Sequence, residues 1–271
     1  MMTIEVKNLV KKYIRGLEKE GRQVYALNGV SLSISSGEFI CIRGRSGSGK
    51  STLMNITAGL MKPTSGCVFF SGGEKFPAGE KMCPAGGEKV GLALASPAGE
   101  KMCPAGARDI FSFSDREMSL YRNSVIGCVP QGHSALSNLS VLDNVRLPFH
   151  LTEREGDSVQ AAYELLAQLE IEPLADSMPR NLSGGELKRM AIARAMINKP
   201  GFLFADEPTG DIDAETAQIV MKIFRKAADN GMAVLMITHD QETVNYADRT
   251  FIMKNGILTA AEAASEAETA N

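Results

Sequence analysis

The sequence has few of the residues that build metal sites and disulfide frameworks. It contains 5 cysteines and 3 histidines among 271 residues. No two cysteines have the C-x-x-C spacing that is typical of zinc ligands. An odd number of cysteines also fits a disulfide framework poorly. We therefore interpret the cysteines as reduced thiols, as expected of a cytosolic protein.

Long apolar runs and an excess of positive charge are also missing. The longest apolar stretches are short, such as Met232–Ile237, whereas a membrane-spanning helix needs roughly 20 apolar residues. Glu5 and Lys7 occupy positions where a secretory signal has its apolar stretch. The net charge of −3 argues against a protein that coats nucleic acid. We expect a soluble, non-secreted protein with no nucleic-acid partner.

The chain does have enough apolar residues, 44% of the total, to form a sizeable core. A short apolar strand at Phe39–Arg43 leads into a glycine-rich loop and then a helix at Thr52–Leu60, which is how an α/β nucleotide-binding fold begins. Further strands are expected at Thr3–Val6, Val24–Ile34, Val125–Val129, Phe202–Ala205 and Ala233–Ile237. Helices are expected at Ser114–Arg122, Ser140–Phe149, Asp157–Leu169, Leu187–Ile197 and Ala214–Ala228. A hairpin is expected over Thr250–Thr259, with its turn at Asn255-Gly256.

One segment interrupts this pattern. The ten residues PAGEKMCPAG at Pro77–Gly86 recur identically at Pro97–Gly106, and only Val90–Ala95 between them is apolar enough for a strand. Two copies are too few for a solenoid, and prolines and glycines at this density prevent long helices. We interpret the segment as a surface insertion, with a partner-binding role as the alternative.

A phosphate-binding loop is predicted at Gly44–Ser51, which matches G-x-x-x-x-G-K-[ST] between a strand and a helix. Its glycines allow the backbone N–H groups to surround phosphate oxygens at the start of the helix. Lys50 supplies a positive charge to the β- and γ-phosphates, and Ser51 offers a hydroxyl to Mg²⁺.

Two acids follow a buried strand in the segment FLFADE, at Phe202–Glu207. Asp206 is expected to hold Mg²⁺, usually through water. Glu207 is placed where a base could orient and deprotonate an attacking water. The Asp-Glu pair alone is weak evidence for a metal-binding and catalytic role, since helix N-termini also favour acids. The glycine-rich loop in the same chain makes this role the better interpretation.

A second anion-binding turn is predicted at LSGGE, Leu182–Glu186. Ser183 and Glu186 have the spacing of a capping box. A cap does not need the two adjacent glycines, whereas a nest of N–H groups for an anion does. One chain therefore carries two phosphate-binding helix starts, which a simple P-loop kinase or GTPase does not need.

With these motifs, nearly the whole chain resembles the ATP-binding subunits of ABC transporters. GRSGSGKST resembles the Walker A motif, Gln131 the Q-loop, LSGGE the signature motif and FLFADEP the Walker B motif. TGDID resembles the D-loop, and His239 the switch histidine. Tyr13, followed by a spacer and ALNGVSLSI, is similar to the macrolide-exporter and lipoprotein-release subgroup, in which this aromatic residue stacks on adenine. Tyr25 is the alternative, and we favour Tyr13.

The resemblance implies a P-loop NTPase fold of the α/β class with a parallel sheet, an N-terminal antiparallel β subdomain and a helical subdomain near residues 134–197. Residues 1–258 would form a single ATP-binding domain with an insertion at about 73–107, and residues 259–271 a disordered tail. The insertion departs from the subgroup, as do Asp211 and Ile212 in the D-loop. It puts in doubt whether substrate and partners are those of the subgroup.

The resemblance also implies ATP hydrolysis, coupled to transport, by a head-to-tail dimer that powers a separate membrane permease from the cytoplasmic face. Each ATP would lie between the Gly44–Thr52 loop of one chain and Ser183–Gly185 of the other. Glu207 would act with His239, Gln131 and Lys50 in catalysis, and Ser51, Gln131 and Asp206 would hold Mg²⁺. The residues implied in ATP binding are Tyr13, Gly44, Arg45, Ser46, Gly47, Ser48, Gly49, Lys50, Ser51, Thr52, Ser183, Gly184, Gly185 and Asp213.

Two other functions fit the same motifs. A nucleotide-switched regulator of a membrane or cell-envelope partner would bind and hydrolyse ATP without transporting anything. A translation or DNA-repair ATPase is a weaker alternative, because such proteins usually have two cassettes or a long coiled coil. The substrate is not encoded in this sequence, because it is selected by the membrane subunit.

Overall fold

The computed structural model describes residues 1–15, 22–72, 106–132, 134–151, 155–210 and 212–261. Within these ranges, no helix has both the length and the apolar character that crossing a membrane requires. The expected strand at Val90–Ala95, both copies of the repeat up to residue 105, and Asp211 lie outside the described residues.

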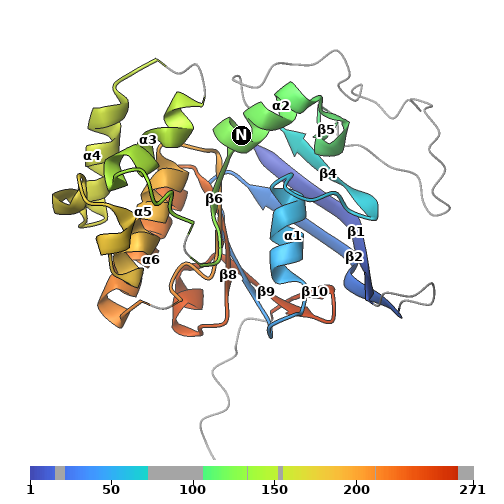
Figure 1. Ribbon diagram of the computed structural model, residues 1–271. Coiled ribbons are helices and arrows are strands. Elements are labelled where there is room, and N and C mark those ends of the chain that lie inside the picture. The colour runs from blue at the N-terminus through green and yellow to red at the C-terminus, as the bar shows by residue number, and fades with distance from the viewer. Residues whose placement is uncertain (16–21, 73–105, 133, 152–154, 211, 262–271) are drawn as a thin grey trace, which may run out of the picture.

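A six-stranded sheet, mostly parallel, forms the centre of the molecule, in the order β10-β9-β3-β8-β7-β6 (Figure 1). Neighbours from β9 to β6 are parallel, and β9 and β10 form an antiparallel hairpin. Its strands are β3 (Phe39–Arg43), β6 (Ile126–Val129), β7 (Phe202–Asp206), β8 (Ala233–Thr238), β9 (Arg249–Lys254) and β10 (Ile257–Ala260). Strands β7 and β8 are buried along their whole length, which explains their unbroken apolar runs.

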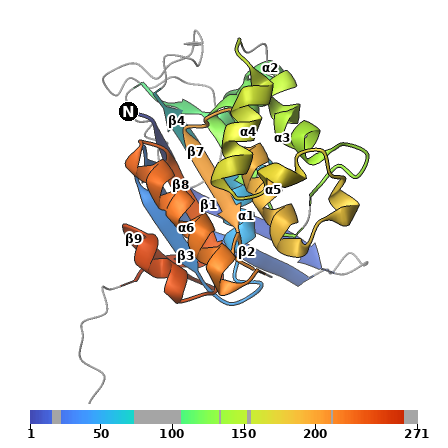
Figure 2. The ribbon, with the colours of Figure 1, turned by 90° about the vertical axis from the view of Figure 1, so that its left-hand side faces the viewer.

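Alternate residues of these strands enter two different cores. Phe202 and Phe204 pack with α1 (Lys50–Thr57) and the N-terminal sheet, whereas Leu203 and Ala205 pack with the helices on the other face. Those helices are α3 (Val141–His150), α4 (Ser158–Gln168), α5 (Gly184–Met196) and α6 (Ala214–Asp229), and Figure 2 shows α6 lying over this face. The central sheet is therefore covered on both sides, as its composition requires.

The N-terminal sheet is antiparallel, in the order β2-β1-β4-β5, and the antiparallel β region predicted from the sequence is present. Its strands are β1 (Thr3–Arg15), β2 (Arg22–Ser35), β4 (Ser65–Ser71) and β5 (Arg108–Asp109). The prediction for β1, Thr3–Val6, was too short. The register of β1 shifts between Val6 and Leu9, where Asn8 has a φ of 49°, and this irregularity interrupts the alternation of apolar residues.

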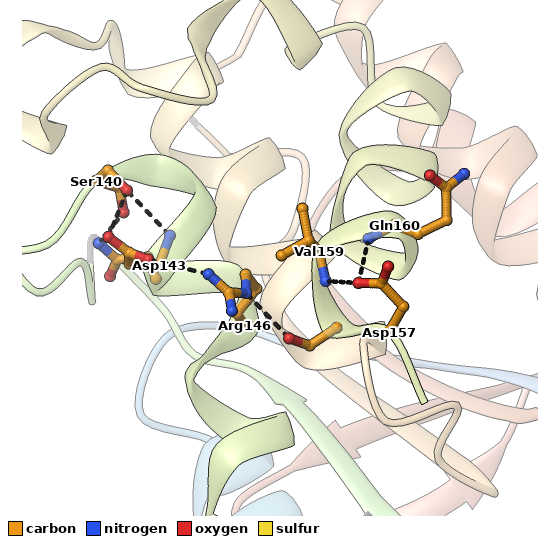
Figure 3. Close-up of polar contacts among 8 residues, drawn as sticks. Ser140, Asp143, Arg146, Asp157, Val159 and Gln160 are labelled. Carbon is orange, nitrogen blue, oxygen red and sulfur yellow. Dashed lines mark hydrogen bonds and ion pairs between the residues drawn. The ribbon is translucent and has the colours of Figure 1, made fainter. Parts of the chain in front are cut away.

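On the second face, a polar contact joins α3 to α4 and another caps α4 (Figure 3). Arg146 on α3 donates to the hydroxyl of Ser158 on α4 at 3.1 Å. Asp157 caps α4 by accepting from the backbone N–H groups of Val159 and Gln160 at 2.8 and 3.1 Å. Each cap satisfies N–H groups that have no partner within the helix, so the polar residues at these positions define where the helices begin.

Several predicted boundaries agree with the structure and others do not. Helix α2 (Asp115–Leu120) begins after Ser114, whose capping box with Glu117 is confirmed, and continues as a π-helical turn at Tyr121–Val125. Helix α5 begins three residues earlier than predicted, because the Ser183–Glu186 cap includes both glycines in its first turn. Short 3₁₀ turns lie at Ile110–Ser112, Glu172–Leu174, Pro179–Asn181 and Glu242–Tyr246.

The C-terminal hairpin turns at Asn255-Gly256 as predicted, with φ values of 51° and 77° that suit a two-residue turn. Strand β10 continues to Ala260 and pairs Thr259 with Ile252, so the tail predicted from residue 259 begins too early. Backbone pairing with β9 keeps these two residues in the sheet even though they add little apolar surface. Residues 262–271 lie outside the described part of the chain.

Cysteines 41, 67 and 128 are free thiols, as expected. Burial raises the pKa of the Cys41 thiol to about 12, so that it stays protonated at neutral pH and is unreactive. Cys83 and Cys103 are outside the described residues.

The insertion joins two paired strands, which makes its removal testable. Phe70 pairs with Arg108, and the same register places Gly72 opposite Gly106. Both glycines have positive φ values, 94° and 74°, as a two-residue type I′ turn requires. Arg108 is fixed independently by an ion pair with Glu117 at 2.7 Å. We expect deletion of residues 73–105, which joins Gly72 to Gly106, to change the melting temperature by less than about 5 °C.

Circular dichroism and calorimetry of the deletion variant would test this expectation. A matched variant in which Gly72 and Gly106 are also replaced by valine, which disfavours positive φ, should be clearly less stable. A large fall in melting temperature for the first variant would show that the inserted segment stabilises the core.

Candidate functional site

A cleft of about 490 Å³ lies between the N-terminal sheet and the carboxyl ends of β3 and β7. Ligand sites of α/β proteins are found at this end of the strands. Residues from distant parts of the sequence line the cleft, and most of them belong to the predicted motifs. The lining residues are Tyr13, Ile14, Val24, Tyr25, Ala26, Ser46, Gly47, Gly49, Lys50, Ser51, Thr52, Gln131, Asp206 and Glu207.

The predicted phosphate-binding loop connects the end of β3 to the start of α1. Gly47 and Gly49 have φ values of 76° and 109°, and a side chain on Gly49 would come within 2.1 Å of the carbonyl oxygen of Ala26. Lys50 is buried, and its Nζ donates to the carbonyl oxygens of Gly44 and Arg45 at 2.7 and 3.1 Å. The loop is thus held in a tight curve around the lysine, with its middle residues exposed to the cleft.

One hydroxyl of this loop is buried and does not line the cleft. The Oγ of Ser48 is buried and has no hydrogen-bond partner within the described part of the chain. A buried polar atom without a partner is costly. Ser48 does not line the cleft, whereas Lys50 does, together with Ser46, Gly47 and Ser51 of the same loop. The charge of Lys50 and the polar groups beside it at the start of a helix fit a nucleotide phosphate.

Asp206 is the last residue of β7 and is buried beside the hydroxyl of Ser51. Burial raises the pKa of Asp206, and the Ser51 hydrogen bond and the charge of Lys50 only partly oppose this rise. A cation at this position would favour the charged carboxylate. The oxygen atoms of Ser51, Gln131 and Asp206 are ligands that suit Mg²⁺.

No group of three or more acidic, histidine or cysteine side chains able to hold a metal occurs in the described ranges. Mg²⁺ at such a site would therefore rely on substrate phosphates and water for its other ligands, as is usual for this ion in nucleotide sites.

Glu207 is positioned by its backbone, which has a φ of 49°. Its N–H donates to the carbonyl oxygen of Ile237 on β8 at 2.9 Å. The carboxylate accepts from Nε2 of Gln131 at 3.2 Å and lies 3.3 Å from Nδ1 of His239. Three predicted catalytic residues from three strand ends therefore meet around one carboxylate at the mouth of the cleft.

The segment after Gln131 is fixed by two helices. Asn144 on α3 is fully buried and donates to the carbonyl oxygens of Leu136, Leu139 and Ser140. Arg194 on α5 donates to the carbonyl oxygen of Ser134 at 2.8 Å. The backbone from Ser134 to Ser140 is thus fixed by side chains of α3 and α5.

The predicted signature residues do not line this cleft. Ser183 caps α5, accepting from the N–H of Glu186, whose carboxylate accepts in return from the Ser183 N–H at 2.7 Å. These hydrogen bonds lower the pKa of Glu186. Asp213 caps α6 through the N–H and hydroxyl of Thr216, which lowers the pKa of Asp213. The structure therefore gives both residues a capping role within the chain.

Both candidate tyrosines line the cleft. The Tyr13 hydroxyl donates to Sδ of Met61 at 3.1 Å, and Nζ of Lys12 lies 4.9 Å from the centre of the Tyr25 ring. The adenine-stacking role of Tyr13 stays a prediction, with Tyr25 as its alternative.

Sequence reasoning missed one residue close to the site, Lys188. This lysine is 4% exposed, and its Nζ donates to the carbonyl oxygen of Glu207 at 3.2 Å. The signal was present, because Lys188 shares a helix face with the apolar Ala191 and Ile192, both buried. A lysine in such a position is almost never fully buried unless it is paired.

Comparison with known proteins places these observations in a family. A model described as "ABC transporter" matches residues 27–210. The chain is 34% identical, over 94% of its length, to the macrolide export ATP-binding/permease protein MacB of Chlorobaculum tepidum, of which it spans 33%. It is 36% identical, over 91% of its length, to the lipoprotein-releasing system ATP-binding protein LolD of Aquifex aeolicus, of which it spans 92%.

Solved structures agree with these relatives. The dimeric post-hydrolysis structure of the ATP-binding cassette MJ0796, bound to ADP and Pi, matches with a TM-score of 0.74 and 30% identity. The match covers 96% of this chain and 99% of that one. A second dimeric structure of MJ0796 matches with a TM-score of 0.75.

The contact at Gly49 predicts the effect of one methyl group. In Gly49→Ala the new Cβ meets a backbone oxygen that cannot move aside, and the φ of 109° disfavours alanine as well. We expect at least about a tenfold loss of ATP affinity, measured by titration calorimetry. Gly231→Ala is the control, because it has a φ of 94°, no atom within 4 Å of the new Cβ, and lies away from the cleft. Equal ATP affinities in the two variants would contradict the prediction.

Proposed function

The chain belongs to the ABC transporter family, and we propose that it forms a head-to-tail dimer that powers a separate membrane permease, in export or in mechanical transmission to the cell envelope. As a cassette of this family it binds and hydrolyses ATP.

The assignment of the catalytic residues rests on one observation. Gln131, Glu207 and His239 converge within 3.3 Å contacts at the mouth of a cleft whose floor is the phosphate-binding loop. Hydrolysis requires a water held in line with the γ-phosphate and a base that accepts its proton. Glu207 is the base in this proposal, and Gln131 and His239 fix its carboxylate.

The remaining polar groups stabilise charge. Lys50 contacts the β- and γ-phosphates, exchanging at least one of its two backbone carbonyl partners for a phosphate oxygen. Ser51, Gln131 and Asp206 hold Mg²⁺, which when bound neutralises charge on the phosphate oxygens. Because these groups are held in place before substrate arrives, little reorganisation is needed in the transition state.

The second half of the site comes from another copy of the chain. Ser183, Gly184 and Gly185 lie outside their own cleft, and MJ0796, a structural neighbour, forms dimers. In a head-to-tail dimer these residues, with Asp213, face the ATP bound by the partner. The N-terminus of α5 then offers free N–H groups and a positive dipole end to the γ-phosphate. Tyr13 stacks on the adenine at the opposite end of the cleft.

A separate permease is supported by the relatives. LolD, which is named as an ATP-binding protein, is matched over nearly its whole length, whereas the ATP-binding/permease protein MacB is matched over a third of its length. The permease would hold the chain at the cytoplasmic face of the membrane. Which cargo, if any, it moves is a property of that subunit.

Loss of the proposed base should abolish hydrolysis and not binding. Glu207→Gln keeps the shape of the side chain and one acceptor oxygen but cannot accept the proton from water. We expect turnover to fall by about 10²- to 10⁴-fold, with ATP affinity retained, measured by phosphate release and calorimetry. The matched control is Glu164→Gln on the exposed side of α4. Near wild-type turnover in Glu207→Gln would refute the assignment.

The two-chain site can be tested by complementation. Lys50→Ala removes a charge from a chain's own loop, and Gly185→Asp places a negative charge beside the partner's phosphates. Each variant should be nearly inactive by itself, yet a mixed dimer contains one site built from an intact loop and an intact signature turn. We expect mixtures to hydrolyse ATP faster than the sum of the two variants. If exchange between subunits is demonstrated and no gain appears, catalysis is not shared.

A further inference from the structure

A buried lysine joins α5 to the residue proposed as the base. Lys188 lies one turn beyond the signature residues, and its Nζ is 3.2 Å from the carbonyl oxygen of Glu207. Its helix neighbours Met190, Ala191 and Ile192 are buried and apolar. If packing were the only requirement, another apolar residue would suit this position, because burying a charge costs free energy unless the charge is paired. The hydrogen bond to the Glu207 carbonyl oxygen is one of the interactions that this buried lysine makes.

The carbonyl group that Lys188 contacts belongs to a peptide in an unusual conformation. Glu207 is a non-glycine residue with a φ of 49°, in the left-handed region. Its N–H is fixed by Ile237, and its carbonyl oxygen accepts from the Gly210 N–H at 3.1 Å as well as from Lys188. The direction of the side chain follows from this backbone. The contacts of the carboxylate with Gln131 and His239 therefore depend on the peptide being held.

We propose that Lys188 is a positioning residue for Glu207, and that it links the helix facing the partner's ATP to the carboxylate acting on the chain's own ATP. The hydrogen bond is charge-assisted, which makes it stronger than one between neutral groups. This inference rests on the proposed function, because it takes Glu207 as the base and Ser183–Gly185 as contacts across the dimer. It adds that two positions on one helix, Ser183 and Lys188, serve different ATP molecules.

Lys188→Met tests the positioning role. Methionine has a similar length and an apolar stem but no donor, so a buried site should accept it without loss of stability. We expect kcat to fall by about 10- to 100-fold, the scale of a misplaced catalytic group, at saturating Mg²⁺ with KM for ATP and the melting temperature little changed. Lys188→Arg, which keeps a charged donor, should recover part of the rate. Lys222→Met, on an exposed position of α6, is the control.

Two results would overturn the inference. One is a kcat for Lys188→Met equal to that of the wild type. The other is a loss of kcat accompanied by a clear fall in the melting temperature, or by a loss of ATP affinity as large as the loss of kcat. Either would indicate a general structural role. A double variant gives an independent test, because Lys188→Met should lower the residual rate of Glu207→Gln no further if it acts through that side chain.

Mixed dimers separate the two helix positions. Lys50→Ala silences one site, so the remaining activity comes from the chain that keeps Lys50 and the signature turn of the other. Relative to that dimer, Lys188→Met should reduce the rate when it is on the chain that keeps Lys50. On the chain with Lys50→Ala it should have little effect, whereas Gly185→Asp should show the opposite pattern. Equal losses in both arrangements would contradict a role within the chain.

The inference and the proposed function fail in distinguishable ways. If Glu207→Gln hydrolyses ATP normally, the assignment of the base is wrong. If Glu207→Gln is inactive and Lys188→Met behaves as the wild type does, the base is correctly assigned and only the role of Lys188 is refuted.

Discussion

Backbone hydrogen bonding between parallel strands sets the geometry of the whole cleft. Strand β8 pairs with β3 on one side and β7 on the other, with Arg43 opposite Thr238 and Asp206 opposite Ile237. The phosphate-binding loop, Glu207 and His239 follow these strand ends directly, and Asp206 is the last residue of β7. Because the pairing continues past β7 in the hydrogen bond from the Glu207 N–H to Ile237, the carboxylate is fixed relative to β8 before any ligand binds.

Buried charged groups lie at this edge of the sheet. Lys50 and Lys188 donate to backbone carbonyl oxygens, and both lie near the Asp206 carboxylate, whose pKa their charges lower. Asp206 has a raised pKa although Ser51 and two lysines lie nearby. A site of this kind gains electrostatically from a ligand that brings both negative phosphates and a divalent cation.

Local sequence rules were sufficient wherever a short segment determines its own structure. The strand at Phe39–Arg43, the Ser114 and Ser183 capping boxes and the Asn255-Gly256 turn depend on neighbouring residues, and all were predicted. The full length of β1 was not, because its bulges are imposed by pairing with two different strands. Strand β4 was missed for a related reason. Its partners β1 and β5 are distant in the sequence.

For the site, the motifs identified which side chains take part, and the tertiary structure shows which of them contact one another. Nothing local indicates that Gln131 and His239 both reach Glu207, since their strands are separated by whole helices. The contact of Lys188 depends on how α5 packs against the end of β7. The choice between Tyr13 and Tyr25 depends on where the adenine lies between two adjacent strands, and neither residue spacing nor the lining of the cleft determines it.

The insertion enters the chain at a point separate from the strands that line the cleft. It enters between β4 and β5, and β5 is the edge strand of the N-terminal sheet. The cleft is lined by β1 and β2, and β2 lies at the opposite edge of that sheet. Arg108 and Glu117 anchor the chain again immediately after the insertion. Residues 73–105 therefore enter the chain at the edge of the N-terminal sheet opposite to β2, and not between the strands whose pairings position Lys50, Asp206 and Glu207.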